Sequence, residues 1–276
     1  MKHLCVIGDP IAHSLSPAIQ NALLLSLHLP YFYEAVEVKS HETAAFLTRA
    51  KGGDWAGFNA TMPHKTALVP LLDELTADAA RCGAVNAVRL RDGRAVGDNT
   101  DGRGFLQSLP DSPAGKNICL LGAGGAARAL AVALTEAGAR VTVCCRTPAK
   151  GEALAALCPG LRATDFSAKA LSVAAGETDL LVNATPLGMT APFPTLTFLS
   201  ALRPGVPVCD LIYQPAETAL LAAARRGGHP TQNGSDLLLH QAILSLSFFL
   251  DCPIDPAAAL PVAQAALAQA MEEGGR

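Results

Sequence analysis

The strongest signal for the fold of this chain is the stretch Cys119-Leu-Leu-Gly-Ala-Gly-Gly-Ala-Ala-Arg-Ala-Leu-Ala-Val-Ala-Leu134. An apolar run typical of a strand precedes its glycines, and an alanine-rich run typical of a helix follows them. Gly122, Gly124 and Ala127 fit the pattern G-x-G-x-x-A, whose glycines permit a tight turn and the close approach of a pyrophosphate. The pattern predicts a dinucleotide site at a helix N-terminus, with an ordinary tight turn as the alternative. The candidate phosphate-binding residues are Gly122, Ala123, Gly124, Gly125 and Ala126.

The end of the next strand, in residues 141–150, indicates which dinucleotide is bound. An NAD site usually carries an Asp or Glu here for the ribose 2′-hydroxyl. This stretch has no carboxylate, and Arg146 offers a planar fork of donors suited to a 2′-phosphate. Thr147 adds a hydroxyl and Lys150 a positive charge. These residues predict NADP as the cofactor, and the alternative is two ordinary surface cations after a strand.

Strand-like and helix-like segments alternate along the whole chain. This alternation predicts parallel sheets in two α/β domains with a cleft between them. The composition agrees, because only 16% of the 276 residues are charged and 50% are hydrophobic. The apolar helix over 236–250 is expected to return to the N-terminal domain and to be buried there.

Charge and cysteine usage exclude several classes of protein. A net charge of −3 without a basic block argues against a nucleic-acid partner. The eight cysteines include no C-x-x-C pair, so we expect free thiols in a reducing compartment and no metal site. No apolar run reaches the roughly 18 residues that span a bilayer, and no signal-peptide core is present. The predicted location is therefore the cytoplasm, without membrane association.

Polar residues at the predicted strand ends are candidates for a substrate site. Ser14 and Ser16 precede a helix N-terminus, which favours an anion such as a carboxylate; alternatively Ser16 is only the N-cap, before Pro17. Further candidates with structural alternatives are Asn59, Thr61 and Lys65 after a strand, Asn86 in an apolar run and Asp101 before a helix. Asn183 and Thr185, at another strand end, are candidates for cofactor binding. By itself Lys65 reads as a surface lysine, since lysine is almost never buried without a partner.

The ordered set of motifs resembles the shikimate dehydrogenase family over nearly the whole chain. The resemblance rests on residues 8–17 (GDPIAHSLSP), 59–65 (NATMPHK), 83–86 (GAVN), 97–102 (GDNTDG), 122–129 (GAGGAARA), 145–150 (CRTPAK), 183–189 (NATPLGM), 210–215 (DLIYQP) and 233–242 (NGSDLLLHQA). Each motif by itself is weak, and the set in this order is specific.

The resemblance implies an N-terminal substrate domain over 1–101, completed by C-terminal helices over 236–276, and a Rossmann-type NADP-binding domain over 102–235. It implies the reversible NADPH-dependent reduction of 3-dehydroshikimate to shikimate, a step of chorismate and aromatic amino acid biosynthesis, by a monomer or homodimer. Lys65 and Asp101 would be catalytic. The implied substrate-binding residues are Ser14, Ser16, Asn59, Thr61, Asn86, Tyr213 and Gln241.

Three departures from the family pattern are visible in this chain. Gln20 stands where a histidine is common, Cys145 replaces an asparagine of the NADP motif, and Asp236 replaces a glycine. Two other functions stay open, namely a quinate/shikimate dehydrogenase with a broader substrate or cofactor range, and a catalytically silent paralogue that binds a nucleotide or metabolite.

Arg146→Ala should raise the Michaelis constant for NADPH much more than that for NADH, because only NADPH carries the 2′-phosphate. Steady-state kinetics with each cofactor measures the effect. An equal effect on both cofactors would contradict the assignment of Arg146.

Overall fold

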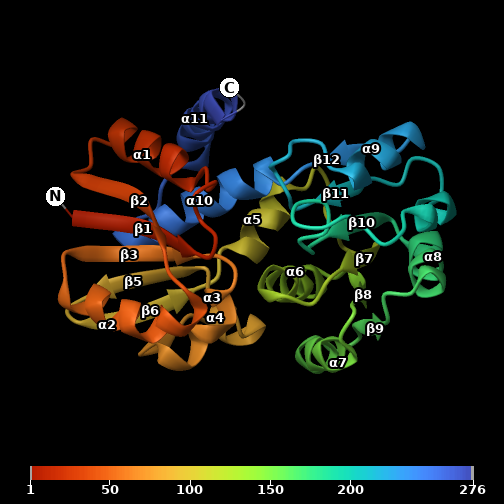
Figure 1. The fold of residues 1–276 in the computed structure, drawn as a ribbon, viewed down its shortest axis with the longest axis horizontal. Helices are drawn as coiled ribbons and strands as arrows, with labels where there is room; N and C mark the ends of the chain where they lie inside the picture. Colours follow the sequence, from red (N-terminus) through yellow and green to blue (C-terminus); the bar gives the residue numbers. More distant parts are fainter. Residues whose placement is uncertain (1, 275–276) are drawn as a thin grey trace. The chain divides into compact units, whose positions relative to one another are not determined.

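The structure is a computed structural model that describes residues 2–274 (Figure 1). The chain divides into two compact units. The first consists of the described residues up to Gly104 together with those from Leu238 onward, and the second is Phe105–Leu237. The chain passes between the units inside helix α5 (Asp101–Ser108) and inside helix α10 (Ser235–Leu250).

The second unit contains a six-stranded parallel sheet in the order β12-β11-β10-β7-β8-β9. This is the doubly wound order of dinucleotide-binding folds, so the predicted Rossmann-type domain is confirmed. Its strands are β7 (Asn117–Leu121), β8 (Arg140–Cys144), β9 (Arg162–Thr164), β10 (Leu180–Asn183), β11 (Val208–Asp210) and β12 (Thr231–Gln232). Its helices are α6 (Gly125–Glu136), α7 (Pro148–Leu157), α8 (Ala168–Glu177), the 3-10 helix Thr197–Ala201 and α9 (Ala219–Arg226).

The first unit has a sheet in the order β2-β1-β3-β5-β6-β4. Its strands are β1 (Lys2–Gly8), β2 (Tyr31–Glu37), β3 (Trp55–Ala60), β4 (Glu74–Leu75), β5 (Ala87–Arg91) and β6 (Arg94–Asp98). Its helices are α1 (Ser16–Ser26), the 3-10 helix Ser40–Glu42, α2 (Thr43–Gly52), α3 (His64–Ala67), the 3-10 helix Val69–Leu71, α4 (Ala77–Cys82) and α11 (Pro256–Gly274).

The prediction of parallel sheets is wrong for part of this first sheet. Strands β2, β1 and β3 are parallel, but β5 runs antiparallel to both β3 and β6. The physical reason for the antiparallel β5–β6 pair is the two-residue turn Asp92-Gly93, in which both residues have positive φ. Such a turn matches the twist of an antiparallel hairpin and leaves no room for a crossover helix.

Each face of the first sheet is covered by helices. Cys5 and Ile7 of β1 pack with α2. The rings of Phe46 in α2 and Phe58 in β3 meet edge to face, with their centroids 5.2 Å apart. The opposite face carries α1 and α10, and Phe249 of α10 packs directly against Gly57 of β3 (Figure 1). The predicted return of the apolar helix to the N-terminal unit is therefore confirmed.

The cysteines contribute to packing. All eight are free thiols, and seven of them, including those of strands β1, β7, β8 and β11, are buried. Within residues 2–274 no group of three or more His, Cys, Asp or Glu side chains is arranged to hold a metal ion. In the same residues, none of the helices combines the length and the apolar character that a membrane span requires.

A buried histidine anchors the short helix α3, which follows β3. His64 is fully buried; its Nε2 lies 2.8 Å from Val38 O and its Nδ1 2.8 Å from Thr43 Oγ1. The carbonyl can only accept, so Nε2 donates to it. Burial lowers the pKa of His64 below its ordinary value. The neutral ring therefore ties the start of α3 to the end of β2 and to α2.

This histidine should make stability fall on acidification. Because the pKa of His64 is lower in the folded chain, the unfolded chain binds more protons below about pH 6.5, and the free energy of unfolding decreases there. Urea unfolding between about pH 8 and pH 5 should show a shallower decrease for His64→Gln than for the unmodified chain. The exposed His41, changed to Gln, is the matched control and should keep the full decrease. Identical slopes for His64→Gln and the unmodified chain would contradict this.

Candidate active site

Lys65 and Asp101 form a partly buried ion pair, although they are 36 residues apart in sequence. Lys65 lies in α3 and Asp101 is the first residue of α5, and Lys65 Nζ donates to Asp101 Oδ2 at 2.5 Å. The side chains are 17% and 7% exposed. The greater exposure of Lys65 leaves its ammonium accessible to a ligand, while the carboxylate of Asp101 stays covered. Within residues 2–274, the other two N–H groups of Lys65 have no partner, so they remain available as donors.

The carboxylate of Asp101 is held from a second side. Asn86 Nδ2 donates to Asp101 Oδ1 at 2.8 Å, so each carboxylate oxygen has its own donor. The backbone of Lys65 is fixed as well, because Val85 N donates to Lys65 O at 2.7 Å. The approach to β5 thus positions both members of the ion pair.

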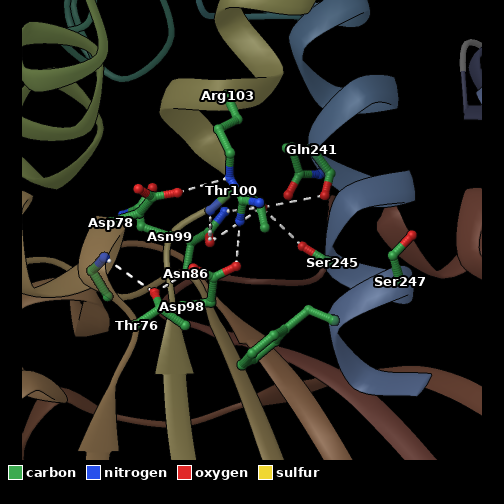
Figure 2. A network of polar contacts seen from close by, with 12 residues as sticks. Thr76, Asp78, Asn86, Asp98, Asn99, Thr100, Arg103, Gln241, Ser245 and Ser247 are labelled. Carbon is green, nitrogen blue, oxygen red and sulfur yellow. Dashed lines mark hydrogen bonds and ion pairs between the residues drawn. The ribbon is translucent and has the colours of Figure 1, made fainter. Parts of the chain in front are cut away.

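The turn before Asp101 is surrounded by polar contacts (Figure 2). The buried carboxylate of Asp98 accepts from Thr76 Oγ1 at 2.5 Å and pairs with Arg103, whose Nε also lies 3.0 Å from Asp78. Asn99 Nδ2 donates to Ala84 O at 2.9 Å. Asp98 thus has Arg103 as its counter-ion, and Asp101 has Lys65.

Asn59 and Thr61 differ in how much of their hydrogen-bonding capacity is free. Asn59 is buried; its Nδ2 donates to Asn86 O and Ser245 Oγ, both at 2.9 Å, and its Oδ1 accepts from Tyr33 at 2.7 Å. The Thr61 hydroxyl, after the end of β3, makes no hydrogen bond within the described chain. Thr61 is therefore the one of the two whose side chain is open to a ligand.

Ser14, Ser16 and Gln241 also lie in the first unit. Helix α1 begins at Ser16 with Leu15 as its N-cap, so the prediction of Ser16 as the N-cap is wrong. The Ser16 hydroxyl is left without a bond among residues 2–274, and Ser14 Oγ accepts from Ser16 N at 3.3 Å. Gln241 Nε2 donates to Leu238 O at 2.9 Å, which leaves its carbonyl oxygen available. Tyr213 belongs to the second unit, where it lies half-buried after β11.

The glycine turn after β7 has the form that a pyrophosphate requires. Gly122 has φ +107°, and a Cβ there would lie 2.9 Å from Thr185 Cγ2, so only glycine fits. A Cβ at Gly124, the N-cap of α6, would meet nothing within 4 Å, so the space beside this residue is open. The first N–H groups of that helix have no intrahelical acceptor and can receive an anion.

The residues after β8 fit a 2′-phosphate. Arg146, Thr147 and Lys150 are exposed, and neither cation has an ion-pair partner within residues 2–274. Cys145 is buried and its thiol donates to Thr147 O at 3.4 Å, so it shapes this turn in place of an asparagine. Burial raises the pKa of the Cys145 thiol, which keeps it protonated. The donor set thus suits NADP.

Asn183 and Thr185 form a buried support at the end of β10. Asn183 Nδ2 donates to Asp210 Oδ1 at 2.9 Å and to Leu187 O at 3.2 Å, and its Oδ1 accepts from Thr185 Oγ1 at 2.6 Å. Burial raises the pKa of Asp210, which also accepts from Thr218 at 2.7 Å. These contacts shape the loop beside Gly122, and they use all of the Asn183 amide.

Sequence reasoning missed several members of the polar network around Asp101. Tyr33, Thr76, Thr100, Arg103 and Ser245 were not singled out, although each bonds to a site residue or to the turn before Asp101. One signal was available for Ser245, because a serine in the nearly all-apolar run 242–250 has to find a polar partner.

Comparisons with known proteins identify the family of this chain. The family model described as the shikimate dehydrogenase substrate binding domain matches residues 6–88, and that described as shikimate / quinate 5-dehydrogenase matches residues 106–189. A shikimate dehydrogenase (NADP(+)) of Desulfitobacterium hafniense is 39% identical, over 91% of this chain and 93% of that protein. One of Methylobacterium radiotolerans is 44% identical, over 86% and 87%.

Among solved structures, shikimate 5-dehydrogenase from Thermus thermophilus in complex with NADP(H) and shikimate is similar to this chain. It is 36% identical with a TM-score of 0.82, over 96% of this chain and 100% of that one. Matches of this extent, to both halves of the chain, show that the chain belongs to the shikimate dehydrogenase family.

Proposed function

We propose that this chain catalyses the reversible NADPH-dependent reduction of 3-dehydroshikimate to shikimate, as a step of chorismate biosynthesis in the cytoplasm. The observation that carries the proposal is the Lys65–Asp101 ion pair, because it places a positioned acid in a member of this family. A silent paralogue would have no need to keep both residues.

In the proposed mechanism Lys65 is the general acid. Its ammonium has two N–H groups beyond the one bonded to Asp101, and one of them would donate to the carbonyl oxygen of the substrate. Asp101 holds the ammonium in place and stabilises its charge. In the reverse direction the neutral amine would take the proton from the hydroxyl. When bound, NADPH supplies the hydride for the carbonyl carbon.

The substrate would be oriented by the remaining polar residues of the first unit. Ser14 and Ser16 are suited to the carboxylate, since the Ser16 hydroxyl is free at the start of α1. Thr61 and Gln241 have free groups for ring hydroxyls. Asn59 and Asn86 complete the proposed substrate-binding set of the first unit, and Tyr213 of the second unit is proposed separately as a substrate-binding residue.

The cofactor would be held by the second unit. The backbone of Gly122–Ala126 would receive the pyrophosphate, and Arg146, Thr147 and Lys150 the 2′-phosphate. Asn183 and Thr185 would support the adjoining loop. We accordingly propose residues 1–101 with 236–276 as the substrate domain, and 102–235 as the NADP-binding domain.

A second candidate function is a dehydrogenase that also accepts quinate. The description of the family model for residues 106–189 names both shikimate and quinate. The chemistry at Lys65 would be the same for both substrates.

A spectrophotometric assay that follows the absorbance of the reduced nicotinamide tests the proposal with shikimate and quinate, each with NADP and NAD. We expect shikimate with NADP to give by far the largest kcat/KM. Comparable rates with quinate would favour the second candidate. Purified protein that binds NADPH but turns over none of the pairs would refute the proposal.

Lys65→Ala should lower kcat by on the order of 10²–10⁴, with a small change in the Michaelis constant for shikimate, because it removes the proton donor. Lys51→Ala is the matched control, since Lys51 also pairs with an aspartate, Asp73, at 2.7 Å but away from the site. The control should keep normal kcat. A Lys65→Ala variant with near-normal kcat would remove Lys65 from the mechanism.

Asp101→Asn should also lower kcat severely, because a neutral amide no longer stabilises the ammonium of Lys65. Steady-state kinetics at several pH values measures this effect. Its Michaelis constant for shikimate is less informative, since the substitution can also weaken substrate binding. An unchanged kcat would show that the ion pair has no part in the reaction.

A further inference from the structure

The carboxylate of Asp101 is aligned by a chain of hydrogen bonds that begins on another helix. Asn86 Nδ2 donates to Asp101 Oδ1 at 2.8 Å and to Thr100 Oγ1 at 2.9 Å. Asn86 Oδ1 accepts from Thr100 N at 2.8 Å, which fixes the orientation of the amide. The position of the Asn86 amide, and with it that of Asp101, therefore depends on Thr100.

Thr100 is in turn bonded to a serine of α10. Thr100 and Ser245 are both fully buried, and their hydroxyl oxygens lie 2.9 Å apart. Figure 2 shows Ser245 pointing from α10 toward Thr100. Thr100 Oγ1 also lies 3.2 Å from Gln241 O, so α10 contacts this hydroxyl at two points.

The direction of these hydrogen bonds follows from the partners. Ser245 Oγ accepts from Asn59 Nδ2 at 2.9 Å, and among residues 2–274 its own proton has Thr100 Oγ1 as its one acceptor. Asn59 is oriented by Tyr33, whose phenol donates to Asn59 Oδ1 at 2.7 Å. Burial raises the pKa of the Tyr33 phenol, so it stays a donor.

We propose that Ser245 is a positioning residue for the reaction, which acts through Thr100 and Asn86 to align Asp101 with Lys65. Ser245 itself makes no hydrogen bond to Lys65 or Asp101. The proposal rests on the proposed function for its kinetic effect, but the alignment itself is a structural property of the first unit. Loss of the Ser245 hydroxyl would leave the Asn59 amide without one acceptor and Thr100 without one donor in a buried place.

The helix offers a matched control. Ser247 lies in the same helix, two residues further, and points away from the network (Figure 2). Its hydroxyl donates to Ile243 O at 3.1 Å and accepts from Ile254 N at 3.2 Å. Ser247→Ala thus removes a hydroxyl of the same kind without touching Thr100 or Asn59.

The test combines kinetics with crystallography on Ser245→Ala, Ser247→Ala and the isosteric Thr100→Val. We expect Ser245→Ala and Thr100→Val to lower kcat on the order of tenfold, the equivalent of one buried hydrogen bond, with little change in the Michaelis constant for NADPH. Ser247→Ala should keep normal kcat. In crystals of Ser245→Ala, the Asp101 carboxylate should rotate away from Lys65 or occupy two conformers.

A double-mutant cycle tests whether Ser245 acts on the reaction through Asp101. In an Asp101→Asn background, Ser245→Ala should have almost no further effect on kcat, because it acts through that carboxylate. A full additional loss in that background, or normal kcat in Ser245→Ala alone, would overturn the proposal. If the protein proved inactive with 3-dehydroshikimate, the proposed function would fail. The crystal structure of Ser245→Ala would then be the test of whether Ser245 aligns Asp101. An Asp101 carboxylate that has not moved would overturn the proposal.

Discussion

The ion pair between Lys65 and Asp101 is the interaction on which the candidate active site depends. A nearly buried carboxylate is stable only where its charge is paired and its oxygens accept hydrogen bonds. Asp101 meets both conditions, because Lys65 supplies the charge and Asn86 the second donor. The surrounding turn has the same requirement for Asp98, which Arg103 and Thr76 satisfy. Each buried acid thus imposes a specific set of neighbours.

The architecture of the first unit brings these neighbours together from distant parts of the sequence. Strand β3 ends beside α3, so Lys65 lies close to the approach to β5, which carries Asn86. The hairpin turn Asp92-Gly93 returns the chain along β6, and Asp101 follows at the end of that strand. Helix α10 then closes the polar network through Ser245. Packing of apolar faces holds these strands and helices together, and the hydrogen bonds fix which of their polar residues face one another.

Local signals made much of this predictable. The glycine pattern after β7, the absence of a carboxylate after β8, and the apolar character of α10 each depend on neighbouring residues alone, and each prediction agrees with the structure or with the comparisons. The alternation of strands and helices predicts a parallel β5, and this is wrong because the hairpin turn Asp92-Gly93 makes β5 and β6 antiparallel. The predicted start of α1 differs from the observed start by one residue, since a serine before a proline suits either side of a helix boundary.

The doubly wound fold and the residues suited to a 2′-phosphate follow from residue type and local spacing, so they could be predicted from the sequence. Lys65 as the candidate acid was implied only by the resemblance to a known family. The folded structure was needed to show that Asn59 and Asn183 have their amides engaged inside the protein, while Thr61 and Ser16 keep their hydroxyls free within the described chain. The folded structure also shows that Ser245 takes part in the polar network around Asp101. The physical reason is that a hydrogen bond requires donor and acceptor within about 3 Å, and the distance between residues far apart in sequence is set by packing.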